Sequence, residues 1–129
     1  MPWDWPAVVN HLEAQAFCQW KGKLIGKDIR LPTEAEYEAL LSTLLPDGKA
    51  NIRLEAYASE TPVDSHMNSS VGFYDVIGNV WQHLSTIFYP YKGFKFHPYY
   101  EDFSSPTFDG KHNLMRGGSW INQGGFAEK

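Results

Sequence analysis

The side chains best suited to chemistry gather between Tyr89 and His112 of this 129-residue chain. The stretch offers phenols, carboxylates, a phenyl ring and an imidazole: Tyr89, Tyr91, Tyr99, Tyr100, Asp102, Phe108, Asp109 and His112. A phenol can donate a proton or a hydrogen bond to a bound group. His112 lies in a glycine-containing turn, where it can line a substrate cleft. We therefore predict that this stretch contacts a substrate; the alternative is that its rings only pack the loop against the core.

Metal and thiol chemistry find less support in the sequence. The five histidines, at positions 11, 66, 83, 97 and 112, form no i, i+4 pair and have no cysteine at ligand spacing. We therefore expect no self-contained metal site, and we interpret His83 as a core or rim histidine. The single cysteine, Cys18, allows no internal disulfide and fits a reducing compartment, so we expect a cytoplasmic protein.

Length and charge exclude several classes of partner. A chain of this length forms one domain, here residues 1–129. The net charge of −4, without a cluster of Lys or Arg, argues against nucleic-acid binding. No apolar run approaches the roughly 18 residues of a membrane span, so we expect no membrane partner.

Two helices must precede the aromatic stretch. Asn10 and Glu13 form a capping box that starts the first, which we expect Gly22 to end. Its apolar residues fall on one stripe: Leu12, Ala16, Phe17 and Trp20. Thr33 and Glu36 start the second, and Pro46-Asp-Gly48 ends it in a turn. The apolar face of this second helix follows a helical period: Tyr37, Leu40, Leu41 and Leu44.

From about residue 49 the helical period is lost, and glycines separate short extended pieces. Pro90, Pro98 and Pro106 should prevent regular secondary structure between Phe88 and Phe108. A loop of this length is often functional. Two helices followed by irregular antiparallel β structure and long loops predict an α+β domain.

Three ordered motifs resemble the formylglycine-generating-enzyme-like, or sulfatase-modifying-factor, domain. They are Arg30-Leu-Pro-Thr-Glu-Ala-Glu-Tyr37, Gly72-Phe-Tyr-Asp-Val-Ile-Gly-Asn-Val-Trp-Gln82 and Leu114-Met-Arg-Gly-Gly-Ser-Trp120. The resemblance covers nearly the whole chain and implies a C-type-lectin-like fold. We assign Trp81, Trp120 and the pair Gly117-Gly118 to architecture, with the rings filling the centre. Arg116 should brace a neighbouring loop.

A narrower resemblance points to the iron-dependent 5-histidylcysteine sulfoxide synthases of ovothiol biosynthesis, which are related to ergothioneine synthases. It rests on Met1-Pro-Trp-Asp-Trp-Pro6, Pro90-Tyr-Lys-Gly-Phe94 and Asp102-Phe-Ser-Ser-Pro-Thr-Phe-Asp-Gly-Lys-His-Asn113. These oxidoreductases join cysteine to the histidine ring with O2. Formylglycine formation in the wider family uses two cysteines that bind copper, and this chain has Cys18 alone.

The resemblance implies how the work is divided in such an enzyme. Fe(II) is held by three histidines of a separate helical domain, whose ligands are not in this chain. The lectin-like domain supplies a tyrosine near the metal, here Tyr99 or Tyr100, and polar groups toward the sulfur substrate. The remaining substrate-binding candidates are Tyr89, Asp102, Phe108, Asp109 and His112.

Calcium is a second implied metal. Family members that bind it use two side-chain oxygens and two carbonyls around the Gly-Asn-x-Trp turn. Here these are Asp75, the carbonyls of Gly78 and Val80, and Gln82, where the family often has glutamate. Calcium prefers six to eight oxygen ligands and gains from negative charge. We expect weak binding at this one turn, or a turn satisfied by the protein alone.

The resemblance further implies that the domain is incomplete. The family adds an Arg- and Phe-rich stretch after the Gly-Gly-Ser-Trp strand, and Gln123-Gly-Gly-Phe126 departs from its pattern. We expect a substrate-side domain that is inactive without its helical partner. An unpaired strand edge would favour a homodimer. The alternatives are a non-catalytic lectin-like binding module and a relic fragment.

Overall fold

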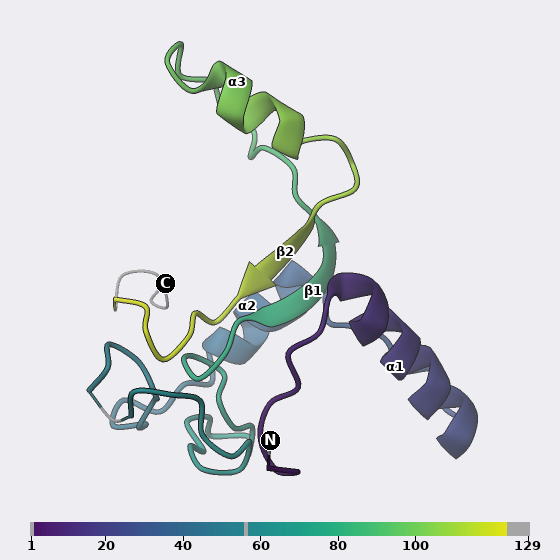
Figure 1. Ribbon diagram of the computed structural model, residues 1–129, viewed down its shortest axis with the longest axis vertical. Helices are drawn as coiled ribbons and strands as arrows, with labels where there is room; N and C mark the ends of the chain where they lie inside the picture. The colour runs from purple at the N-terminus through teal and green to yellow at the C-terminus, as the bar shows by residue number, and fades with distance from the viewer. Residues whose placement is uncertain (1, 56, 124–129) are drawn as a thin grey trace.

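The computed structural model describes residues 2–55 and 57–123. In chain order its elements are α1 (His11–Ile25), α2 (Glu34–Leu41), β1 (Gln82–Ile87), α3 (Glu101–Ser104), the 3-10 turn η1 (Ser105–Thr107) and β2 (Asn113–Arg116). Helices and an antiparallel strand pair confirm the α+β class. In Figure 1, α2 lies against the strand pair, α1 projects to one side, and α3 lies at the end of a long arm.

Helix α1 begins where its capping box predicts. The Asn10 side chain accepts from the Glu13 amide at 3.0 Å, and the Glu13 carboxylate accepts from the Asn10 amide at 2.7 Å. The prediction that Gly22 ends the helix is wrong, because α1 continues to Gly26, whose φ is 65°. Gly22 has a different role: a Cβ there would lie 2.6 Å from the carbonyl oxygen of Lys27, where the chain folds back.

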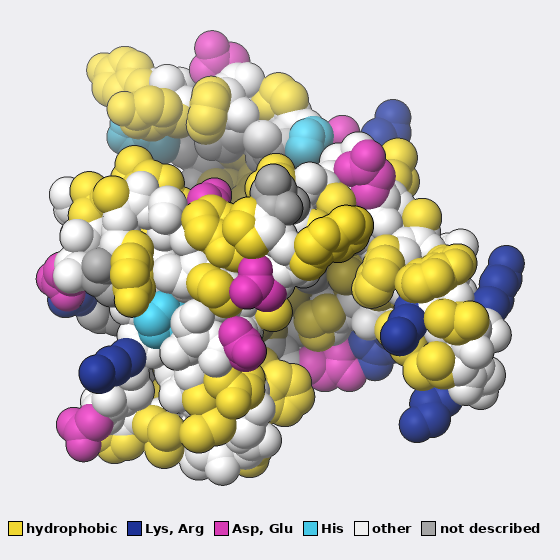
Figure 2. Space-filling model, turned by 60° about the horizontal axis from the view of Figure 1, so that its bottom comes forward, with side chains coloured by type: hydrophobic (Ala, Val, Ile, Leu, Met, Phe, Trp, Pro, Cys, Tyr) yellow, Lys and Arg dark blue, Asp and Glu magenta, His cyan; other side chains and the backbone are white. Residues whose placement is uncertain are grey.

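The apolar stripe of α1 is largely exposed. The exposed fractions of Leu12, Phe17 and Trp20 are 73%, 58% and 56%, whereas Cys18 is buried. Figure 2 shows yellow hydrophobic side chains beside dark-blue Lys or Arg side chains on the right-hand projection. A helical period alone therefore does not place α1 in the core.

Helix α2 supplies half of a small core. Tyr37 and Leu41 pack with Val76 and Leu84, and each of the four is at most 2% exposed. The capping box of Thr33 is present as predicted. The helix nevertheless ends at Leu41, before the predicted Pro46 turn.

Hydroxyl groups explain this early end of α2. Ser42 Oγ donates to the Ala39 carbonyl at 2.6 Å, and Thr43 Oγ1 donates to the Leu40 carbonyl at 2.7 Å. Such local bonds compete with the helical ladder. An isolated bridge between Leu44 and Ser69 then draws the chain away from the helix axis.

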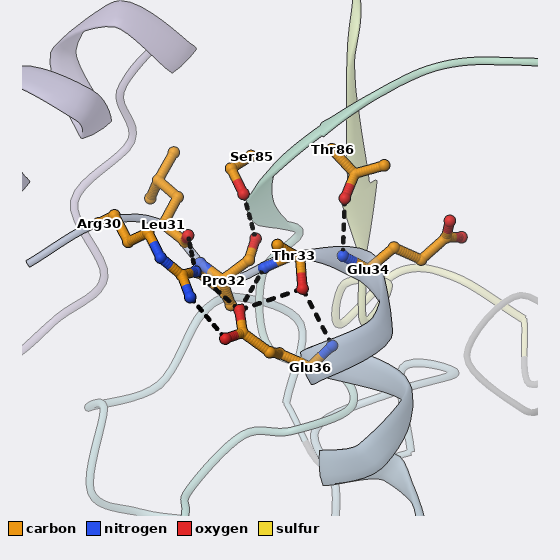
Figure 3. A network of polar contacts seen from close by, with 8 residues as sticks. All are labelled: Arg30, Leu31, Pro32, Thr33, Glu34, Glu36, Ser85 and Thr86. Carbon is orange, nitrogen blue, oxygen red and sulfur yellow. Dashed lines mark hydrogen bonds and ion pairs between the residues drawn. The ribbon is translucent and has the colours of Figure 1, made fainter.

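Strands β1 and β2 form an antiparallel pair with an irregular register. Gln82 lies opposite Arg116 and Ile87 opposite Asn113, with a bulge between. The start of α2 is attached to β1 by polar contacts, which Figure 3 shows together. Thr86 Oγ1 accepts from the Glu34 amide at 2.8 Å, and the Ser85 hydroxyl donates to the Pro32 carbonyl at 3.2 Å.

The Gly-Asn turn joins distant parts of the chain. The Gly78 amide donates to the Gly117 carbonyl at 2.7 Å, and the Asn79 amide donates to the Asn51 carbonyl at 2.8 Å. A Cβ at Gly78 would lie 2.6 Å from the Asn51 oxygen, so this crossing requires glycine. Over the described residues, no helix has the length and apolar character to span a membrane.

Candidate functional site

Residues 88–112 form an arm that extends from the end of the strand pair (Figure 1). The prediction that prolines prevent regular structure here is wrong, because the arm contains α3 and η1. Pro106 lies in the first turn of η1, where a missing amide proton costs no hydrogen bond. Helix α3 and the 3-10 turn η1 thus form the outer end of the arm.

Four phenylalanines of the arm pack against one another, and two of them, Phe94 and Phe96, are still 49% and 40% exposed. The rings of Phe88 and Phe108 stack with centroids 4.9 Å apart. Phe94 and Phe96 approach Phe108 at 5.6 and 5.8 Å. These rings pack against one another and not against the main core. Phe108 is the centre of this cluster, and its contact with a substrate stays a prediction.

Tyr99 and Asp102 line an open hollow on α3 and η1. The hollow measures about 740 Å³, and Glu101 adds a second carboxylate to its wall. Tyr99 is 86% exposed, and Tyr100 is 62% exposed with its ring 5.7 Å from that of His97. Neither hydroxyl bonds to a side chain or backbone in the described part of the chain. Both phenols are therefore open to a partner or ligand.

Asp109 and His112 form a second group at the inner end of the arm. Oδ1 of Asp109 accepts from the Lys111 amide at 2.8 Å and lies 2.9 Å from Nδ1 of His112. The Lys111 amide and, next, the His112 ring lower the pKa of Asp109. The Tyr89 hydroxyl lies 3.7 Å from the position of a Cβ at Gly110. The Tyr89 hydroxyl thus lies beside the turn that carries Asp109 and His112, and none of the three lines the hollow at Tyr99.

A contact that the sequence did not reveal ties the arm to α2. Tyr91 donates a hydrogen bond to Glu34 across 57 positions of the chain. Arg116 lies beside the same glutamate and also pairs with Glu38. Arg116 therefore braces a helix, where a loop was expected.

The predicted calcium turn brings Asp75 and Gln82 together. Oδ2 of Asp75 accepts from Asn79 at 3.1 Å, and the Gln82 amide donates to the Asp75 carbonyl. Oδ1 of Asp75 is buried without a hydrogen-bond partner among the described residues. Burial raises the pKa of this carboxyl, against the hydrogen bond from Asn79. This buried oxygen without a donor suits a cation, and calcium binding at the turn stays a prediction.

The expectation that Trp81 and Trp120 fill the centre is wrong. They line a cavity of about 310 Å³ together with Val8, Val9 and Met115, and Trp81 is 37% exposed. No sequence pattern indicated this cavity, because its wall combines the N-terminal segment with residues of the Gly-Asn-x-Trp and Gly-Gly-Ser-Trp motifs.

His83 lies at the rim of the same cavity. Its Nε2 is 3.0 Å from the Val9 carbonyl, and its ring packs 5.7 Å from that of His11. Burial and the neighbouring His83 lower the pKa of His11. Within residues 2–55 and 57–123, no group of three or more His, Cys, Asp or Glu side chains could hold a metal.

The chain is similar to one protein family and to individual proteins. Residues 2–129 match the family described as "Sulfatase-modifying factor enzyme 1-like domain". Hercynine oxygenase from Mycobacterium tuberculosis is 30% identical, over 93% of this chain and 31% of its own length. Formylglycine-generating enzyme from Mus musculus is 29% identical, over 88% of this chain and 34% of its own. The chain thus spans about a third of these relatives.

A shorter match involves a third protein. Ergothioneine biosynthesis protein 1 from Neurospora crassa is 36% identical over 59 residues, which cover 46% of this chain and 7% of that protein.

Proposed function

Because this chain belongs to the sulfatase-modifying factor enzyme 1-like domain family, we propose that it forms the substrate side of an iron-dependent sulfoxide synthase. The reaction joins cysteine to the histidine ring with O2, as in ovothiol biosynthesis. The S–H bond of cysteine and a C–H bond of the histidine ring break, and a carbon–sulfur bond forms. The sulfur takes one oxygen atom of O2, and the other leaves as water with those two hydrogens. The relatives named hercynine oxygenase and ergothioneine biosynthesis protein 1 support this class.

The main support for this proposal comes from the side chains of the arm. The arm leaves the side chains of Tyr99 and Tyr100 exposed to solvent, and Tyr99 shares its hollow with Asp102. A tyrosine placed in this way can donate a hydrogen bond or a proton to a group bound by a facing domain. At the inner end, His112 and Asp109 can hold polar groups of an amino-acid substrate. Tyr89 and Phe108 would complete the wall.

The iron belongs to another domain in this proposal. The described residues contain no cluster of three metal-binding side chains, so they do not fit a mononuclear iron site. In the proposal, a helical partner domain supplies the iron ligands, and the chain is inactive without it. We assign no step of the reaction to iron held by this chain. Formylglycine formation by a cysteine pair is not proposed, because Cys18 is the single cysteine.

Calcium would have a structural role at the Gly-Asn turn. Asp75, Gln82 and the carbonyls of Gly78 and Val80 are its proposed ligands. A C-type-lectin-like architecture, a cytoplasmic location and pairing of two copies through an exposed strand edge complete the proposal. Light scattering across protein concentrations measures that pairing, and a monomer at every concentration would contradict it.

The test supplies Fe(II), cysteine, histidine and O2 to the purified chain, with and without a helical iron-binding domain of a sulfoxide synthase. We expect the cysteine–histidine sulfoxide only when both proteins are present. A parallel reaction replaces histidine with hercynine. Product in the hercynine reaction, with none in the histidine reaction, would contradict the ovothiol assignment while leaving the sulfoxide-synthase class intact.

A further inference from the structure

The cavity between Trp81 and Trp120 is not used by the proposed reaction. Its volume of about 310 Å³ lies at the lower end of the range of small-molecule sites. Apolar side chains form most of its wall, among them Val8, Val9 and Met115. It is more closed than the hollow on the arm and lies on the body of the domain. Its size and lining suit a ligand of a few carbon atoms.

The polar groups of this wall differ in whether they already have a hydrogen-bond partner. The Ser119 hydroxyl donates to Asn122 Oδ1 at 2.6 Å, and His83 Nε2 is paired with the Val9 carbonyl. Glu60 lines the cavity, and its carboxylate makes no ion pair or hydrogen bond with the part of the chain that the structure describes. No Lys or Arg stands among the described lining residues. The formal charge of the wall is therefore negative.

This combination selects the charge of a ligand. A carboxylate without a partner attracts a cation, and the attraction between opposite charges is stronger beside an apolar wall than in bulk water. Indole rings attract cations through the negative face of their π-system. An anion would meet Glu60, and a neutral apolar molecule would leave that carboxylate unpaired. We infer that the cavity binds a small organic cation with an apolar body, such as an alkylated ammonium ion.

Indole N–H signals in NMR spectra test this inference without iron or a partner domain. The chain has five tryptophans, and Trp3, Trp5 and Trp20 are absent from the cavity wall, so they serve as internal controls. The probes are choline and its uncharged isostere 3,3-dimethyl-1-butanol. We expect choline to shift the Trp81 and Trp120 signals in a saturable manner. We also expect choline to bind more tightly than the alcohol. Equal binding of both probes, or equal shifts at all five indoles, would overturn the inference.

The variant Glu60→Gln separates charge from shape. It keeps the volume of the side chain, so the alcohol should bind as before. Choline should bind about fivefold more weakly, the size of a partly exposed charge contact. Glu55→Gln is the matched control, because Glu55 is exposed and absent from the wall. Unchanged choline binding in Glu60→Gln, or an equal loss in both variants, would contradict the role of Glu60.

Discussion

The Tyr91 hydroxyl lies 3.0 Å from Oε1 of Glu34 and donates a hydrogen bond to it. Glu34 is the first residue of α2, and Arg116 Nη1 lies 3.9 Å from the same oxygen. Within the described residues, no other side-chain hydrogen bond links the arm to the body of the domain. The hydrogen bond with Glu34 raises the pKa of Tyr91. Two signature residues, Glu34 and Arg116, thereby help to position the arm.

Removing this hydroxyl should loosen the arm. We expect trypsin to cleave Tyr91→Phe after Lys92 and Lys95 about threefold faster than the parent chain, as loss of one weak hydrogen bond implies. Tyr89→Phe is the matched control, because Tyr89 is also exposed but its hydroxyl has no partner in the described chain. Equal cleavage of the two variants would show that Tyr91 does not hold the arm.

The Arg30–Glu36 pair makes the start of α2 sensitive to acid. Arg30 donates two hydrogen bonds to Glu36, at 2.7 and 2.8 Å (Figure 3). These bonds, with the Thr33 amide, lower the pKa of Glu36 to about 2. The stability that Glu36 contributes is fully present above the ordinary pKa of glutamate and is lost as pH falls through that lowered value.

The variant Glu36→Gln should therefore lose most of this dependence. Its thermal midpoint should change less than that of the parent chain between about pH 5 and pH 2. Glu13→Gln is the control, because Glu13 occupies the same capping position in α1 without an arginine partner. A full acid-dependent fall in Glu36→Gln would contradict the assignment.

Tyr37 should give the opposite dependence at alkaline pH. Its hydroxyl donates to the Val76 carbonyl at 2.6 Å, and burial raises its pKa to about 12 although Arg116 acts against this. The stability linked to this proton is present below the ordinary pKa of tyrosine and is lost as pH rises toward that raised value. Tyr37→Phe leaves the Val76 carbonyl unpaired and should cost about 1–3 kcal/mol of unfolding free energy at neutral pH.

Denaturant titrations at several pH values measure this difference. Because phenylalanine does not titrate, the deficit of Tyr37→Phe should shrink as pH rises above about 10. A deficit that stays constant across this range would contradict the linkage between the Tyr37 proton and stability.

The starts of the helices could be predicted from sequence because capping is local. Asn10 with Glu13, and Thr33 with Glu36, lie three positions apart and bond as predicted. The ends could not, since they depend on distant or competing contacts. Gly22 is required by the close approach of the Lys27 carbonyl. Helix α2 ends where the hydroxyls of Ser42 and Thr43, just beyond its last residue, bond to carbonyls of its last turn.

The residue types of the candidate site could be predicted from the sequence, but not which of these residues lie together in the folded chain. Tyr99 and Asp102 share a hollow because α3 forms, which the prolines seemed to exclude. Trp81 faces a cavity because a segment near Val8, far away in sequence, supplies the opposite wall. No local period encodes such contacts, so only the folded chain reveals them.

Calcium should stabilise the Gly-Asn turn through Asp75. We expect Ca²⁺ to raise the thermal midpoint of the parent chain, while Mg²⁺, which prefers a smaller octahedral shell, has less effect. Asp75→Asn should abolish the response to Ca²⁺, and Asp64→Asn, at a nearby exposed carboxylate, should retain it. The absence of any Ca²⁺-dependent shift in the parent chain would refute the site.

The central claim is that this domain supplies the substrate side of the reaction. Its most direct test holds a helical iron-binding domain constant and adds increasing amounts of this chain, with product measured by mass spectrometry. The account predicts sulfoxide that rises to saturation and is strongly reduced when Tyr99 and Tyr100 are both replaced by phenylalanine. Tyr74→Phe, outside the arm, should leave the yield unchanged. Sulfoxide formed by this chain alone, or none in any mixture, would contradict the account.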